Sequence, residues 1–102
     1  MPQFQKIAAK SEIGEGKMKE YQLQGKTITV ANWQGEYLAF DGICTHAYCS
    51  LAGGFLDGYT VTCYCHGSMF DLKSGEVLSP PATVPVKLYP LKIEGDDILV
   101  DL

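Results

Sequence analysis

Arginine is absent from the sequence, and its eight lysines are outnumbered by twelve carboxylates, which leaves a net charge of −4 at pH 7. Proteins that bind nucleic acids usually have a basic stripe and arginines that contact phosphates, so the composition argues against that class. No apolar run approaches the roughly 20 residues of a membrane-spanning helix, and the first residues lack the continuous apolar segment of a signal peptide. We therefore expect a cytoplasmic protein without a membrane anchor.

Lysine is also absent between Lys26 and Lys73. The composition favours an acidic protein partner or one with a basic docking face. The lysine gap either arises by chance or indicates that the cysteine and histidine region meets its partner mainly through shape and apolar contact.

Long helical patterns are missing, and short β-type runs separated by turn signals such as Gln24-Gly25 and Gln34-Gly35 take their place. A chain of 102 residues has the size of one ordinary domain. We predict a single all-β domain over residues 1–102, an antiparallel sandwich or barrel. The expected strands are Phe4 to Ala8, Met18 to Leu23, Thr27 to Ala31, Tyr37 to Phe40, Tyr59 to Thr62, Val84 to Tyr89 and Ile98 to Leu102.

Two adjacent prolines, Pro80 and Pro81, interrupt the strand pattern. Neither has an amide hydrogen to donate, so the pair cannot lie inside a central strand. We predict a stiff loop over residues 79–83.

Cysteine and histidine gather in two short clusters, CTH at residues 44–46 and CYCH at residues 63–66. Sixteen residues separate them, in the pattern C-x-H-x16-C-x-x-H. Each cluster follows an expected strand and leads into a loop that contains glycine, so the two loops can face each other on one sheet. Two sulfur and two nitrogen ligands arranged in this way suit a [2Fe–2S] centre with mixed ligands.

With these two loops the sequence resembles the Rieske-type ferredoxins. CTH and CYCHGS are the ligand loops of that family, and residues 70–76 followed by Pro80-Pro81-Ala82 resemble the sequence after the second loop. The resemblance covers about residues 37–102. It implies a Rieske-type antiparallel β-sandwich or barrel in which two loops, over about residues 42–70, form a small cluster-binding subdomain that the proline loop at about 79–83 covers.

The resemblance also implies the ligands of the centre. Cys44 and Cys63 would bind the inner iron, and His46 and His66 would bind the outer iron through their side-chain nitrogens. Ser68 stands where the quinol-oxidising members of the family place a hydroxyl donor to the cluster.

Cys49 and Cys65 are outside the ligand pattern. From the residues alone, they form either a disulfide between the facing loops or two buried thiols in a reducing cytosol. The resemblance favours the disulfide, because Rieske subunits of quinol-oxidising complexes have one between their loops. Ferredoxins that serve aromatic-ring oxygenases usually lack it.

Two other interpretations remain open at this stage. A structural zinc module also uses two cysteines and two histidines, although it usually pairs cysteine with cysteine and histidine with histidine. A thiol redox sensor would switch through Cys49 and Cys65, with a metal centre that is only structural.

No catalytic machinery is evident in the sequence, which has no nucleophile paired with an uncommitted base and no phosphate-binding glycine loop. We therefore expect an electron carrier rather than an enzyme. As the resemblance implies, it would pass single electrons from a reductase to an oxygenase or another oxidoreductase, as a monomer.

Overall fold

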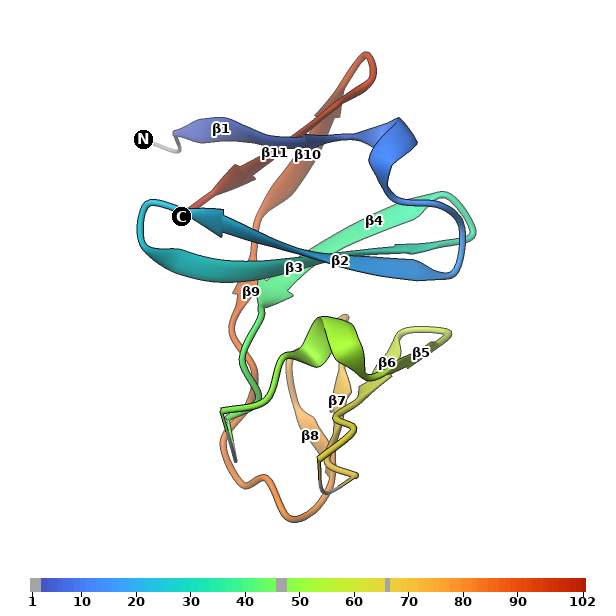
Figure 1. Cartoon of the computed structure of the whole chain (residues 1–102), viewed down its shortest axis with the longest axis vertical. Coiled ribbons are helices and arrows are strands. Elements are labelled where there is room, and N and C mark those ends of the chain that lie inside the picture. The colour runs from blue at the N-terminus through green and yellow to red at the C-terminus, as the bar shows by residue number, and fades with distance from the viewer. Residues whose placement is uncertain (1–2, 46–47, 66) are drawn as a thin grey trace.

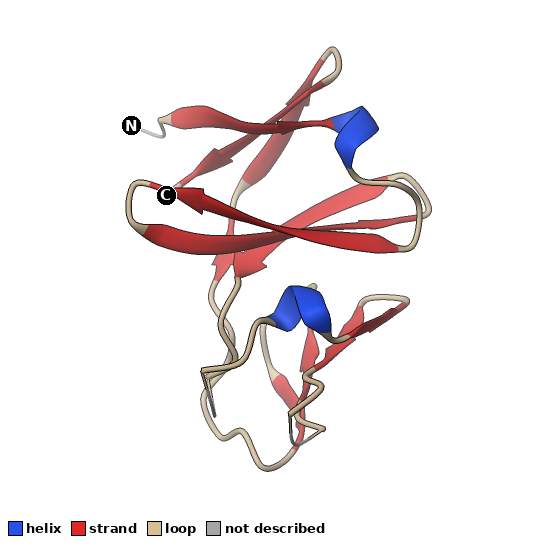
Figure 2. Cartoon of the chain, in the orientation of Figure 1, coloured by secondary structure: helices blue, strands red, loops and turns tan. Residues whose placement is uncertain are grey.

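The computed structural model describes residues 3–45, 48–65 and 67–102 (Figure 1). Antiparallel strands form nearly all of the regular structure, together with two short 3₁₀ turns (Figure 2). Within the described ranges, no helix is long and apolar enough to cross a membrane. The elements are β1 (Phe4–Ala9), η1 (Lys10–Glu12), β2 (Lys17–Leu23), β3 (Lys26–Trp33), β4 (Glu36–Asp41), η2 (Leu51–Gly53), β5 (Phe55–Asp57), β6 (Thr60–Thr62), β7 (Met69–Asp71), β8 (Val77–Ser79), β9 (Leu88–Tyr89), β10 (Leu91–Glu94) and β11 (Asp97–Asp101).

The strands form three small sheets that follow one another along the longest axis of the molecule (Figure 1). The first has the order β1-β11-β10, the second β2-β3-β4-β9 and the third β5-β6-β7-β8. All strand pairs are antiparallel, so the predicted all-β antiparallel class is confirmed. The chain leaves the second sheet after β4, builds the third, and returns through β9.

The second sheet is buried on both faces, because one neighbouring sheet packs on each side. Ile28 and Val30 of β3 belong to the core shared with the first sheet. Ala31 of β3 and Phe40 of β4 belong to the core shared with the third sheet. Since successive side chains of a strand point to opposite faces, β3 supplies both cores at once.

Two of the predicted turns set the register of the second sheet. Gln24-Gly25 joins β2 to β3, and Gln34-Gly35 joins β3 to β4. Both residues of each turn have positive φ, at 52° and 75° in the first turn and 54° and 85° in the second. Two-residue turns of this kind match the right-handed twist of the flanking strands.

The prediction of a strand from Val84 to Tyr89 is wrong except for its last two residues, which form β9. The backbone groups of this segment bond to separate neighbours rather than to one strand: the Val86 amide donates to Gly75 and the Lys87 carbonyl accepts from Asp41. Pro85 has no amide to offer a ladder. Four strands were not predicted, namely β5, β7, β8 and β10, and each has only three or four residues.

One polar group in the second sheet stands out. Thr29 of β3 is fully buried, and its Oγ1 is the only buried side-chain oxygen or nitrogen without a hydrogen-bond partner in the described part of the chain. A buried hydroxyl that has lost water without gaining a partner costs about 1–3 kcal/mol.

We therefore expect Thr29→Val to stabilise the protein by about 1 kcal/mol, because it keeps the side-chain shape and removes the unpaired hydroxyl. Such a gain raises the thermal midpoint of a domain of this size by roughly 4–8 °C. Thr27→Val, on the same strand, is the control, since the Thr27 hydroxyl accepts a hydrogen bond from Gln22 at 2.7 Å. Calorimetry that finds Thr29→Val less stable than the parent would show that the hydroxyl is satisfied.

Candidate metal centre

The first cysteine-containing loop begins where β4 ends. The Gly42 amide donates to Thr27 of β3, and the Leu51 amide returns to Gly42, each at 2.8 Å. Further along the loop, the Cys44 amide donates to the carbonyl of Cys49 at 2.9 Å. These bonds close the loop at its base and fix Cys44 on the second sheet.

The second loop begins where β6 ends. The Cys63 amide donates to Ser68 at 2.8 Å, and the Gly67 amide donates back to Cys63 at 3.1 Å. Gly67 has φ of 80°, a conformation that glycine adopts without strain. As the sequence predicted, each cysteine cluster follows a strand: Cys63 comes directly after β6, and Cys44 comes after β4 with Gly42 and Ile43 between them.

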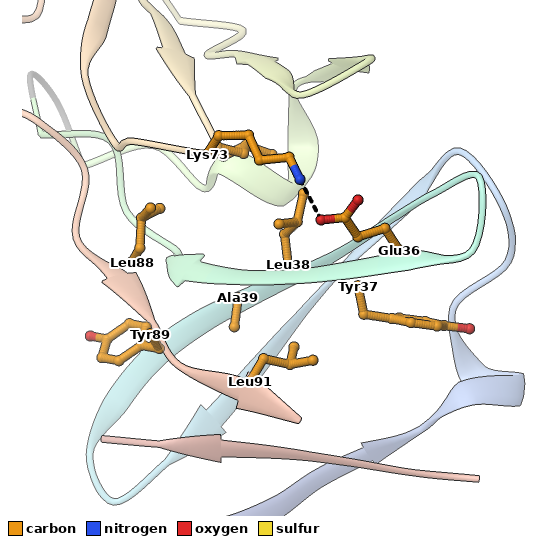
Figure 3. A pocket seen from close by; sticks show the side chains of 9 residues that line it. Glu36, Tyr37, Leu38, Ala39, Lys73, Leu88, Tyr89 and Leu91 are labelled. Atoms are coloured by element: carbon orange, nitrogen blue, oxygen red, sulfur yellow. Dashed lines mark hydrogen bonds and ion pairs between the residues drawn. The ribbon is translucent and has the colours of Figure 1, made fainter. Parts of the chain in front are cut away.

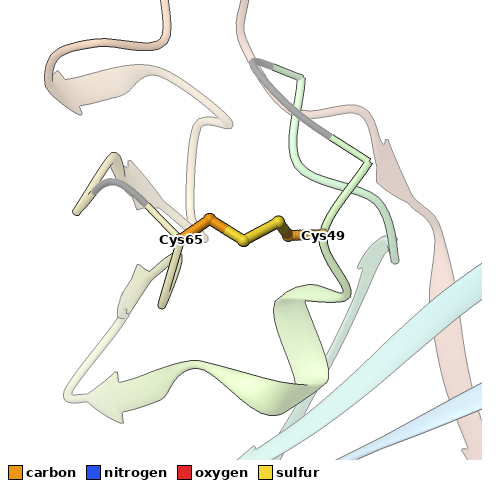
Figure 4. The surroundings of a disulfide bond; sticks show 2 residues. All are labelled: Cys49 and Cys65. Carbon is orange, nitrogen blue, oxygen red and sulfur yellow. A yellow bond between two sulfur atoms is a disulfide. The ribbon is translucent and has the colours of Figure 1, made fainter.

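The structure separates the four cysteines into two kinds. Cys44 and Cys63 are buried and take no part in a disulfide. Cys49 and Cys65 form a disulfide that joins the two loops, with 6.5 Å between their Cα atoms (Figure 4). The predicted disulfide is therefore confirmed. The sulfur of Cys63 lies within 4.8 Å of both disulfide sulfurs, so the two loops meet at this point.

The two histidines of the predicted ligand set, His46 and His66, lie outside the described residues. Thr45 and Tyr48 are the described residues on either side of the first gap, and Cys65 and Gly67 are those on either side of the second.

The proline segment is tied to both loops. The Ala82 amide donates to the buried Ser68 hydroxyl at 3.0 Å, and the Thr45 hydroxyl donates to the Val84 carbonyl at 2.7 Å. Pro80 and Pro81 are joined by a cis peptide bond directly after β8. Sequence reasoning placed a stiff loop here but gave no sign of these two hydrogen bonds, which depend on residues far apart in the chain.

A glycine holds η2 against the second loop. A Cβ atom at Gly54 would overlap the carbonyl oxygen of Thr62 on β6. Only glycine allows this close approach of two backbones. It places the turn after Cys49 beside the strand that leads to Cys63.

A carboxylate connects the second sheet to the third. Glu36 of β4 accepts a hydrogen bond from Tyr59 at 2.7 Å and one from Lys73 at 2.5 Å. The Lys73 ammonium also lies 4.2 Å from the centre of the Tyr59 ring. The bonds from Lys73 and Tyr59 hold the pKa of the Glu36 carboxyl below its ordinary value of 4.5. The bond to Glu36 raises the pKa of Tyr59 and that of Lys73.

A hollow of about 280 Å³ lies beside this ion pair (Figure 3). None of the described residues that line it is a cysteine, so it is separate from the two loops. Its lining consists of Glu36, Tyr37, Leu38, Ala39, Leu72, Lys73, Leu88, Tyr89 and Leu91.

Comparison with known proteins agrees with this arrangement. Residues 3–90 match the Rieske [2Fe-2S] domain family. The chain is 38% identical over 99 residues to the biphenyl dioxygenase ferredoxin subunit of Pseudomonas sp. (strain KKS102), covering 96% of this chain and 91% of that protein. It is 37% identical over 91 residues to the ferredoxin component of the naphthalene 1,2-dioxygenase system of Pseudomonas aeruginosa, covering 89% and 88%.

Solved structures share the fold. The Sphingomonas yanoikuyae B1 ferredoxin superimposes with a TM-score of 0.92 at 27% identity, covering 98% of this chain and 99% of that one. A chain from the complex of reduced oxygenase and oxidized ferredoxin in carbazole 1,9a-dioxygenase gives a TM-score of 0.90 at 27% identity, covering 96% and 92%.

The chain belongs to the Rieske [2Fe-2S] family. It is an electron carrier that holds a [2Fe–2S] centre, and it transforms no substrate itself. The donor set in the structure fits that centre, since two buried thiols outside the disulfide lie on two facing loops. The family match decides against the zinc module.

Removing the disulfide should loosen the two loops. Cys49 and Cys65 are 16 residues apart, and closing a loop of that length stabilises a protein by about 3 kcal/mol. We expect the double variant Cys49→Ala, Cys65→Ala to lose its visible chromophore at a temperature roughly 10–20 °C lower than the parent. The parent kept in a thiol reductant should shift in the same direction. Equal midpoints for parent and variant would mean that other contacts hold the loops together.

The Glu36 contacts should make stability depend on pH. Because the pKa of Glu36 is lowered in the folded state, its contribution is present above the ordinary value of 4.5 and is lost as the pH falls through the lower, folded value. We expect Glu36→Gln to lower the thermal midpoint at pH 7, and its curve to converge with that of the parent in acid. Glu94→Gln, which removes an exposed pair with Lys92 in β10, is the control and should leave the pH dependence unchanged.

Proposed function

We propose that Cys44 and Cys63 bind one iron of the [2Fe–2S] centre and that His46 and His66 bind the other. The observation that carries this proposal is the pair of buried thiols, 4% and 2% exposed, at the start of the two loops that the disulfide joins. Each thiol precedes a histidine by two or three residues. When bound, the centre supplies one-electron chemistry.

The residues around the two loops have separate tasks in this proposal. The Cys49–Cys65 disulfide holds the loops together, and Ala82 and Val84 close the third side through Ser68 and Thr45. The Ser68 hydroxyl accepts from the Ala82 amide and keeps its own proton for a further acceptor. A hydroxyl proton directed at a sulfur of the centre would favour the reduced state.

We propose further that the protein passes electrons from a reductase to the oxygenase of an aromatic-ring dioxygenase system. The support is the naming of its relatives as ferredoxin components of biphenyl and naphthalene dioxygenase systems. We assign it to the cytoplasm as a monomer, with residues 1–102 as one Rieske domain. The cluster-binding loops lie at about 42–70 and the proline loop at about 79–83.

Alanine substitution tests the four ligands one at a time. We expect Cys44→Ala, Cys63→Ala, His46→Ala and His66→Ala each to yield protein without the brown chromophore, because each removes one of two protein ligands from an iron. Tyr48→Phe, between His46 and Cys49, is the control and should keep the chromophore. Circular dichroism of every variant checks that the sheets have formed.

Electron paramagnetic resonance of the dithionite-reduced parent then tests the type of centre. Nitrogen ligation lowers the average g value relative to a centre with four cysteines. An average g value typical of four sulfur ligands, or a histidine variant with an unchanged spectrum, would refute the proposed ligand set. If the visible or resonance spectrum changed when a thiol reductant alone was added, the redox sensor that switches through Cys49 and Cys65 would be favoured instead.

A further inference from the structure

Three sulfur atoms share one small space between the two cysteine loops. Among the described residues, the sulfurs of Cys49, Cys63 and Cys65 all lie within 4.8 Å of one another. Cys49 and Cys65 are bonded as the disulfide (Figure 4). Cys44, the other buried thiol in the described part of the chain, is outside this group. A thiol held beside a disulfide is placed to exchange with it.

The backbone keeps Cys63 beside the disulfide. The residue follows β6 directly, its amide donates to the Ser68 carbonyl at 2.8 Å, and its carbonyl accepts from the Gly67 amide at 3.1 Å. Its side chain is only 2% exposed, whereas Cys49 and Cys65 are half-buried. A thiol in solution therefore has little access to the Cys63 sulfur, but the disulfide reaches it within the fold. Holding two reacting groups together in this way raises the rate of their reaction.

Resting on the proposed ligand role of Cys63, we propose that a chain without its [2Fe–2S] centre rearranges this disulfide, and that binding of Cys63 to iron prevents the rearrangement. The Cys63 thiol gives its proton to water, and its sulfur forms a bond to the sulfur of Cys49. The Cys49–Cys65 bond breaks, and Cys65 leaves as a thiolate that takes a proton from water. One disulfide replaces another, so the step needs no oxidant and no reductant.

Attack on Cys49 is favoured over attack on Cys65. A bridge between Cys63 and Cys65 would close a small ring with only Tyr64 between the two cysteines, and it would leave the loops unconnected. A bridge between Cys49 and Cys63 keeps the loops joined and spans a segment two residues shorter than the original one. Because the entropy of loop closure changes slowly with length, it hardly distinguishes these two inter-loop isomers, and both should be populated.

The exchange blocks the metal site. In the rearranged chain the Cys63 sulfur belongs to the bridge and has no electron pair to offer as a thiolate ligand. A chain that has lost its centre therefore becomes unable to take up a new one until a thiol reductant opens the bridge. This behaviour differs from that of a thiol redox sensor, in which Cys49 and Cys65 gain and lose electrons.

Disulfide mapping of the full chain tests the proposal. The centre is removed with an iron chelator in the absence of oxygen and of added thiol, and the chain is incubated for hours, the time that uncatalysed disulfide rearrangement takes. The reaction is stopped in mild acid with N-ethylmaleimide, which blocks the remaining thiols, and the linked peptides are fragmented in a mass spectrometer. We expect a Cys49–Cys63 bridge and a blocked Cys65 in at least about one chain in ten, because loop entropy barely separates the isomers.

Two matched variants identify the attacking thiol. Cys63→Ser and Cys44→Ser each replace one buried thiol, and circular dichroism checks that the sheets of both have formed. Cys63→Ser should keep the Cys49–Cys65 bridge throughout, whereas Cys44→Ser should rearrange as fully as the parent. The loaded parent, incubated for the same time and then denatured and blocked in the same way, should show only the original bridge.

Reloading gives a second readout. Addition of ferrous iron and sulfide to the incubated chain should restore the chromophore only in the fraction that retains the Cys49–Cys65 bridge. Treatment with dithiothreitol, removed before loading, should restore the full yield.

The outcomes separate this proposal from the ligand set. A chain without its centre that keeps only the Cys49–Cys65 bridge, with its sheets intact, overturns the exchange while the proposed ligands stand. Rearrangement in Cys63→Ser also overturns it, because another group would then be the nucleophile. Rearrangement in the loaded parent, before denaturation, overturns the ligand role of Cys63 and the protection by iron with it.

Discussion

The described parts of the two cysteine loops and of the proline segment have little regular structure of their own, and contacts between these three segments hold them together. The disulfide between Cys49 and Cys65 joins the two cysteine loops. Hydrogen bonds from Thr45 to Val84 and from Ala82 to Ser68 add the proline segment. A redox centre that changes little in geometry on reduction needs ligands that move little, and these few contacts supply that constraint.

The three sheets form a packed support for the two cysteine loops. β3 supplies both cores, so the second sheet is locked between its neighbours. Gly42 bonds the start of the first loop to β3, and Gly54 lets η2 lie directly on β6. Glu36 adds a polar connection through Tyr59 and Lys73, which lie in the turns before β6 and after β7 of the third sheet. These contacts connect both cysteine-containing loops to the second sheet.

The chain combines features that the family resemblance assigns to different branches. Its relatives are ferredoxin components of dioxygenase systems, whereas its disulfide and its Ser68 hydroxyl resemble the subunits that oxidise quinols. A disulfide between the loops stabilises them independently of the metal.

The amino-acid sequence by itself determined the class of the fold, the positions of the turns and the family to which the two cysteine-containing loops belong. Alternation along β2, β3 and β4, glycines at positive φ and the spacing of cysteine and histidine are local signals, and each can be read within a few residues. The tertiary structure alone decided the strand pairing and the hydrogen bonds between segments that are distant in the chain. The three-residue strands of the third sheet, the break of the predicted strand at Pro85 and the bonds of Glu36, Thr45 and Ser68 all depend on partners remote in the chain. A short segment has too little internal pattern to specify its structure, so packing against its neighbours fixes it.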